Sequence, residues 1–229
     1  EAIISILSQI EQEEESIGKA AEIMARAIMN DDVIHVIGPG GHSNMAAEEL
    51  FWRAGGLVPI NAIFDAGINL IHGAKRSNII ERTPGYGIKV MDAYGVGQKP
   101  GEVIIIANAY GINSLTIDIA LEAKKRKMKT IGVTSKSFAQ TVPKNHPARH
   151  PSGKNLYEIV DVFIDNHLPL GDAIVDIEGF EQKVAPTSTF CNSFVMNCLV
   201  IETVKELLRQ GVTPPIWMSA NMPGGDEAN

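Results

Sequence analysis

The sequence has few cysteines and no long apolar segment. Its two cysteines, Cys191 and Cys198, lie seven residues apart in a segment that we predict to be one helix. At the helical rise this spacing separates their Cα atoms by roughly 10 Å, which excludes a disulfide between them and suits a reducing compartment. No apolar run reaches the roughly 18 residues that span a bilayer, and the first residues lack the basic and apolar segments of a secretion signal. We therefore expect a cytoplasmic protein without a membrane partner.

An excess of positive charge is also missing. The 229 residues carry a formal net charge of −7. A general nucleic-acid-binding protein would present a basic face, so nucleic acid is excluded as the expected partner. The one basic cluster is "KKRKMK", from Lys124 to Lys129, and it is typical of the end of a helix, where cations complement the helix dipole. A surface for a protein partner is the alternative.

What is present is an alternation of short β-branched runs with helical segments, which is typical of an α/β protein. Most of the runs are apolar at nearly every position, as in parallel strands that are covered on both faces. We predict a doubly wound, mainly parallel five-stranded sheet flanked by helices, a flavodoxin-like three-layer sandwich. The predicted strands are residues 33–37, 57–64, 103–107, 130–134 and 160–165.

Helices are predicted before, between and after these strands. Residues 2–29 are amphipathic with apolar residues at alternating spacings of four and three, and we interpret them as one long helix. Its apolar face packs either on the chain's own core or on a second subunit. Further helices are predicted over 43–54, 112–127 and 188–209, with a hairpin over 173–186 before the last one. The proline-rich stretch 140–155 is a predicted loop, and its prolines prevent His146 and His150 from forming a helical metal site.

Two polar turns follow predicted strands and provide a candidate anion site. In open α/β sheets, ligands bind beyond the carboxyl ends of the strands, where the first amides of helices face anions. The first turn, "GPGGHS", is not a nucleotide-binding loop, because Ser43 replaces the third glycine and no lysine precedes a serine or threonine. We predict that the two turns bind one phosphate-bearing ligand through Gly40, Gly41, His42, Ser43, Asn108, Tyr110, Gly111, Asn113 and Ser114.

A third polar cluster lies in "APTSTF", residues 185–190, directly before the last predicted helix. Thr187 and Ser188 are candidate ligand-binding residues there. Capping of the following helix, without any ligand, is the alternative role for this cluster and for Asn113 or Ser114 in the second turn.

The order of these motifs resembles the SIS (sugar isomerase) domain family. The resemblance is carried by "GPGGHSNMAAEEL", "NAYGINS", "LPLGDA" and "APTSTF", and it covers residues 1–210. It implies a phosphosugar-binding domain over 32–210, an N-terminal oligomerisation helix over 1–31 and a C-terminal tail over 211–229. It further implies a homodimer or homotetramer, with a sugar phosphate as ligand and with no cofactor or metal. The first loop is similar to phosphoheptose isomerases, whereas "APTST" and "IHG" are similar to arabinose-5-phosphate isomerases.

The second loop departs from the family pattern Ser-x-Ser-Gly-x-Thr, because two amides and a phenol replace its three hydroxyl groups. The residues at those positions are Asn108, Tyr110 and Asn113. Asparagine still donates to phosphate oxygens, and Gly111 still allows close backbone approach. The departure therefore affects the identity of the sugar more than the existence of the site.

Isomerisation of a sugar phosphate requires a base that moves a proton between C1 and C2, and an acid that opens the ring. The resemblance places the base at Glu49, although the spacing from the glycines is three residues shorter than in the family. The neighbouring Glu48 points about 100° away on a helix and is a solvated or paired carboxylate. His72 in "IHG" is the candidate acid, with a capping or core histidine as the alternative.

The function expected from these residues is aldose–ketose isomerisation of a sugar phosphate through an enediolate. A lyase or etherase that acts on an aminosugar phosphate would use similar acids. A non-catalytic phosphosugar sensor is the third alternative, and it is favoured if Glu49 and His72 lie far from the phosphate-binding turns.

Overall fold

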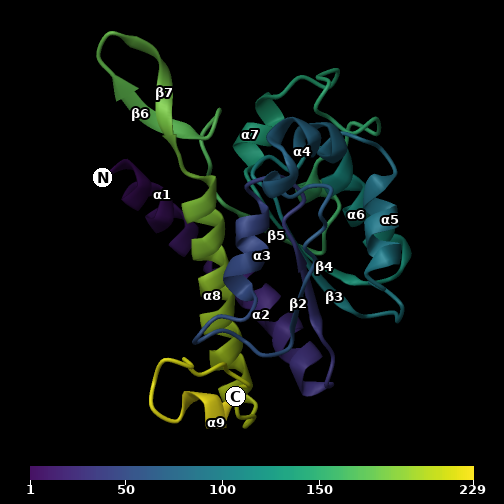
Figure 1. The fold of residues 1–229 in the computed structure, drawn as a ribbon, viewed down its shortest axis with the longest axis vertical. Helices are drawn as coiled ribbons and strands as arrows, with labels where there is room; N and C mark the ends of the chain where they lie inside the picture. Colours follow the sequence, from purple (N-terminus) through teal and green to yellow (C-terminus); the bar gives the residue numbers. More distant parts are fainter.

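A computed structural model describes residues 1–229 and shows a parallel five-stranded sheet between two layers of helices (Figure 1). The strand order is β2-β1-β3-β4-β5, and every neighbouring pair is parallel. This order confirms the predicted doubly wound sheet, and it changes direction between β1 and β3, the position at which such sheets bind ligands. The strands are β1 (Ile34–Ile37), β2 (Ile60–Ala62), β3 (Val103–Ala107), β4 (Lys129–Thr134) and β5 (Val162–Asp165).

Strand β3 is buried at every position because the sheet has a hydrophobic core on each face. Val103, Ile105 and Ala107 point into one core, and Ile104 and Ile106 point into the other, as the two-residue period of a strand requires. An uninterrupted apolar run is therefore the sequence pattern of a central parallel strand.

Each core is closed by a different group of helices (Figure 1). The first core is covered by α1 (Ala2–Glu11), α2 (Glu14–Met29), α3 (Asn44–Leu50) and α8 (Ser188–Arg209). The second is covered mainly by α5 (Tyr86–Ala93) and α6 (Ser114–Lys125), with α4 (Ala74–Glu81) beside α6. The shorter elements are η1 (Leu70–His72), α7 (Lys136–Thr141), η2 (Leu156–Glu158) and α9 (Gly225–Ala228).

Helix α8 has the predicted bounds, and Cys191 and Cys198 on it are free thiols. Helix α8 packs on the first core with one side only. Its sequence is apolar around most of its circumference, which predicts a helix buried between two layers of the protein. Phe190, Ile201 and Leu208 are more than half exposed on its other side.

The N-terminal segment forms two helices instead of one. Helix α1 ends at Glu11 and α2 begins at Glu14. Residues 11–15 read "EQEEE", so no apolar side chain is available there to pack against the core and hold the chain in a continuous helix. The apolar positions on both sides of the break, including Ile10 and Ile17, nevertheless contact the same core, which identifies the chain's own core as one partner of this face.

Several predicted elements are shorter in the structure. The predicted strand 57–64 is reduced to β2, the helix 43–54 ends at Leu50, and the helix 112–127 spans Ser114–Lys125. The basic cluster closes α6 as predicted: Lys124 pairs with Asp161, and Arg126 pairs with Glu122 and Asp92. Three of its five cations, Lys124, Lys125 and Arg126, are therefore paired within the chain.

The predicted hairpin and the C-terminal residues lie at opposite ends of α8 (Figure 1). The hairpin consists of β6 (Ala173–Ile177) and β7 (Phe180–Pro186) and extends away from the sheet. The C-terminal residues pack against the chain before β2, where Trp217 exchanges main-chain hydrogen bonds with Gly55 and Gly56, and its ring lies 4.3 Å from that of Trp52. None of the helices combines the length and the apolar character needed to cross a membrane.

Candidate functional site

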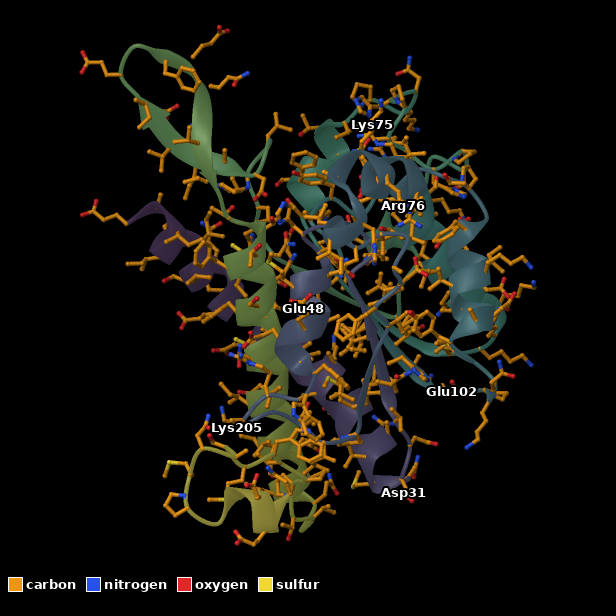
Figure 2. All side chains as sticks on the ribbon, in the orientation of Figure 1. Asp31, Glu48, Lys75, Arg76, Glu102 and Lys205 are labelled. Carbon is orange, nitrogen blue, oxygen red and sulfur yellow. The ribbon has the colours of Figure 1, made fainter.

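A cavity of about 310 Å³ lies beyond the carboxyl ends of β1 and β3, and we call it the main cavity. In Figure 2, Lys75 and Arg76 on α4 are labelled at this end of the molecule. Glu102 and Asp31 are labelled at the opposite end, where the strands begin. Five segments meet here: the turn after β1, the turn after β3, η1 with α4, the residue before the hairpin and the start of α8. The lining residues are Gly40, Gly41, His42, Ser43, Leu70, Ala74, Ser77, Asn78, Glu81, Asn108, Ala109, Tyr110, Asn113, Asp172 and Ser188.

Asn108 joins the two predicted turns. Its Oδ1 accepts hydrogen bonds from the amides of Tyr110 (3.1 Å) and Gly111 (2.8 Å) within the second turn. Its Nδ2 donates to the carbonyl oxygen of Pro39 at 3.1 Å and contacts Ser43 Oγ at 3.4 Å in the first turn. Since β1 and β3 are neighbours, one asparagine is long enough to hold both turns against each other.

The first turn supplies free main-chain donors to the main cavity. The amides of Gly41, His42 and Ser43 donate to no main-chain acceptor, although the Gly41 amide is directed at the Glu81 carboxyl group. Gly40 keeps the space beside them open: a Cβ atom there would lie 3.2 Å from both Asn108 Nδ2 and Glu81 Oε2, and 3.4 Å from Ser43 Oγ. A ligand atom that reaches this point is therefore close to an amide, a hydroxyl and a carboxyl group at once.

Glu81, the last residue of α4, is one of two carboxyl groups that line the main cavity, the other being Asp172, and its role was not predicted from the sequence. Burial raises the pKa of Glu81 above its ordinary value of 4.5, although the charge of Arg82, the Gly41 amide and the Asn113 side chain act in the opposite direction. Asn113 Oδ1 is buried and accepts no hydrogen bond from the protein. A carboxyl group with a raised pKa beside an unused acceptor is typical of a site that handles protons and hydroxyl groups.

Helix α4 places Glu81 by helical spacing. Ala74, Ser77, Asn78 and Glu81 follow one another at intervals of three, one and three residues, so they share one face of α4, and all four line the main cavity. Ser77 anchors this helix, because its buried hydroxyl donates to the carbonyl oxygen of Ile68 at 2.7 Å. The helical spacing of these polar residues could have indicated that they share one face of a helix, but residues 74–81 were not predicted to be a helix.

Tyr110 closes the main cavity with a phenol that stays protonated. Burial, together with the charges of Asp172 and Glu81, raises the pKa of Tyr110 to about 12. Its ring stacks on that of Phe138 with 3.8 Å between the centroids and 16° between the planes. The phenol hydroxyl can therefore donate a hydrogen bond to a ligand at neutral pH.

The start of α8 is occupied by a carboxylate of the protein itself. Asp172 Oδ1 accepts hydrogen bonds from the amides of Thr187 (2.9 Å) and Ser188 (2.7 Å), and its Oδ2 accepts from Ser188 Oγ at 2.7 Å. Asp172 adopts a positive φ of 68° to reach this position. The third polar cluster therefore does cap helix α8, as the alternative role predicted, but the capping side chain is that of Asp172, on the other side of the hairpin.

Replacing Asp172 by alanine is expected to lower the free energy of unfolding by about 1–2 kcal/mol, because two amides and a hydroxyl group lose their shared acceptor. Urea denaturation measures the change. Asp176→Ala is the matched control: this exposed hairpin residue pairs only with Lys183, so its loss is expected to change stability by less than about 0.5 kcal/mol. Equal effects of both variants would contradict the capping role.

The structure brings most of the predicted binding residues together. Eight of them line the main cavity: Gly40, Gly41, His42, Ser43, Asn108, Tyr110, Asn113 and Ser188. Gly111, Ser114 and Thr187 do not line it. Gly111 has a φ of 60°, and a Cβ atom there would lie 2.6 Å from Thr134 Oγ1. Its role is therefore to allow the turn.

The two predicted catalytic residues, Glu49 and His72, do not line the main cavity. Glu49 Oε1 accepts a hydrogen bond from Asn197 Nδ2 on α8 at 3.0 Å and lies 3.5 Å from the Arg53 guanidinium. His72 is exposed at the end of η1. Glu48 is exposed on α3 (Figure 2). The titratable residues that line the main cavity are instead His42, Glu81, Tyr110 and Asp172.

Comparison with known proteins agrees with this fold. The model of the SIS domain family matches residues 1–135, and the chain belongs to this family. It is 38% identical over 220 residues to the UPF0309 protein of Geobacillus thermodenitrificans, covering 96% of this chain and 86% of that one. It is 37% identical over 231 residues to the UPF0309 protein of Shouchella clausii, covering 100% and 91%.

Among solved structures, the phosphoheptose isomerase of Neisseria gonorrhoeae superposes with a TM-score of 0.55 at 16% identity, covering 89% of this chain and 94% of that one. At this level of identity the similarity concerns the fold.

Proposed function

We propose that the protein binds a sugar phosphate in the main cavity and interconverts its aldose and ketose forms. Membership of the SIS domain family and the phosphoheptose isomerase fold support a function related to phosphosugars. The observation that carries the proposal is the convergence of the turns after β1 and β3 on one cavity that also contains Glu81.

The phosphate group is assigned to the first turn. The amides of His42 and Ser43, which donate to no main-chain acceptor, and the Ser43 hydroxyl are donors, and donors of this kind bind phosphate without a lysine or arginine. No lysine or arginine lines the main cavity, so the affinity depends on these directed hydrogen bonds.

Glu81 is assigned the proton transfer. As a carboxylate it takes the proton from C2 of an aldose and returns it to C1 of the enediolate, while the hydroxyl proton moves from O2 to O1. A raised pKa makes the carboxylate a stronger base than an ordinary glutamate, which brings it closer to the pKa that suits catalysis near neutral pH. The neutral Tyr110 phenol donates to the oxygen on which negative charge develops.

A non-catalytic phosphosugar sensor is the second candidate function. The observation that favours it is the position of Glu49 and His72 outside the main cavity. The aminosugar-phosphate lyase or etherase also stays a candidate, because the same acid would serve it. Turnover by the wild-type protein separates the isomerase and the lyase from the sensor.

Thermal-shift measurements with pentose, hexose and heptose phosphates test the binding proposal. A ligand at one hundred times its dissociation constant is expected to add about 2.7 kcal/mol to the free energy of unfolding, because it binds only the folded chain. The unphosphorylated sugars and inorganic phosphate are the controls, and both should raise the melting temperature far less. If no sugar phosphate exceeds these controls, the proposed function is wrong.

A further inference from the structure

A second cavity of about 400 Å³ adjoins the main cavity. The two share four lining residues, Asn78, Glu81, Tyr110 and Asn113. A ligand that is held by the first turn and passes Glu81 therefore reaches the second cavity with its far end. Ligand sites commonly measure about 300–1,000 Å³, so the main cavity alone is at the small end of this range.

The second cavity differs from the main one in its chemistry. Ile112, Phe138 and Ala148 are buried apolar residues in its wall, and Val142 and Leu170 add to them. Leu170 is 60% exposed, so a large apolar side chain stands uncovered beside this wall. The wall is thus suited to apolar groups.

The basic residues of the second cavity are at its rim. Arg82 and His146 line it but are both exposed to solvent. A second phosphate inside the cavity would lose its hydration against apolar side chains without a buried cation to replace it. An apolar ring, in contrast, gains free energy in the same place, because it covers apolar surface that water now contacts.

We propose that the phosphosugar carries an apolar, ring-containing substituent on the side away from its phosphate, and that this substituent occupies the second cavity. The inference rests on the proposed function and names its substrate class: a substituted phosphosugar. Glu81 and Asn113 then face the bond region between sugar and substituent, since both residues line both cavities.

The experiment compares hexose 6-phosphates with their phenyl glycosides by calorimetry. The glycosides serve only as binding probes, because their acetal at C1 prevents ring opening and isomerisation. The wild-type protein is expected to bind a phenyl glycoside about tenfold more tightly than the parent sugar phosphate. Thr141→Trp fills the second cavity from an exposed position whose hydroxyl contacts only the Ser137 carbonyl oxygen. This variant should lose the tenfold preference and keep the wild-type affinity for the parent sugar phosphate.

Two further variants keep the result unambiguous. Gln140→Trp introduces the same side chain at an exposed neighbouring position of α7 that does not line the cavity, and it should behave as the wild type. Leu170→Ser removes apolar surface without adding bulk, and it should weaken only the phenyl glycosides, by a few fold.

The inference is overturned if the wild type binds both ligands of each pair equally, or if Thr141→Trp weakens both to the same degree. In those cases a sugar phosphate still binds, and the proposed function stands. If neither ligand of any pair binds, the proposed function itself fails, and the substituent site fails with it.

Discussion

Glu81→Gln is expected to lower the turnover of a sugar phosphate by about 100-fold or more, because positioned acid–base groups contribute about 10²–10⁴ to such rates. Glutamine has nearly the same shape but cannot take up a proton. Since Glu81 is assigned to proton transfer and not to the phosphate, the dissociation constant for the sugar phosphate should change by a few fold at most. Isomerisation assays and calorimetry on the ligands selected by thermal shift measure both quantities.

Glu49→Gln is the matched control for this experiment. Glu49 is the base implied by the family resemblance, yet its carboxylate is bonded to Asn197 on α8 and does not line the main cavity. We expect the turnover of the Glu49→Gln variant to stay within a few fold of that of the wild type. If Glu49→Gln abolishes turnover and Glu81→Gln retains it, the assignment of the base to Glu81 is wrong.

The same Glu81→Gln variant is expected to be folded, and at neutral pH more stable than the wild type. Because the pKa of Glu81 in the native state is raised above 4.5, the native state binds more protons than the unfolded chain between pH 4.5 and that raised value. The free energy of unfolding of the wild type therefore falls as the pH rises through this interval. Glutamine has no charge to bury, so the difference between variant and wild type should grow from about pH 4 to pH 7. Urea denaturation across this range checks that lost activity is not lost folding.

Gly38→Ala is expected to be the most damaging small substitution in the binding turns. A Cβ atom at Gly38 would lie 1.8 Å from the carbonyl oxygen and 2.2 Å from the carbonyl carbon of Ser43, so the turn after β1 has to move. Forcing an additional carbon into a packed position costs about 1–3 kcal/mol of stability. The movement also displaces the amides of Gly41 and His42, so the affinity for a sugar phosphate should fall more than tenfold.

Gly18→Ala tests whether the effect arises from the position and not from the loss of a glycine. Gly18 is in α2, and no atom lies within 4 Å of where its Cβ atom would be. Alanine is the better helix former, so this variant should gain about 0.5–1 kcal/mol and bind ligand as the wild type does. A Gly38→Ala protein with wild-type stability and affinity would show that the turn after β1 is not held as described.

The central strands were the most predictable part of the fold. β3 and β4 are short, β-branched and buried on both faces, and tertiary contacts reinforce what their sequence favours. The predictions were less accurate where packing acts against local preference. The N-terminal helix breaks at a run of polar residues that has nothing to bury, and β2 is shorter than its apolar segment because it pairs with β1 on one side only.

The two turns that line the main cavity were also visible in the sequence, because glycines and short polar residues directly after a strand mark a turn at the sheet edge. Glu81 was not visible. It lies on a short helix, and nothing local distinguishes its carboxyl group from an exposed one. Its raised pKa arises from burial in the assembled molecule. Asp172 is similar, since the residues that it caps lie on the far side of a hairpin, 15 and 16 positions away.

The sequence by itself determined the order of strands and helices, the parallel sheet and the two polar turns at its carboxyl edge, because hydrophobic periodicity and turn chemistry are local properties. Only the tertiary structure decided which carboxyl groups face the cavity. Glu49 turns toward α8, Glu81 turns toward the first turn, and Asp172 closes the start of α8. The direction of a side chain and the pKa of its acid depend on which other segments pack around it, and those contacts are distant in the sequence.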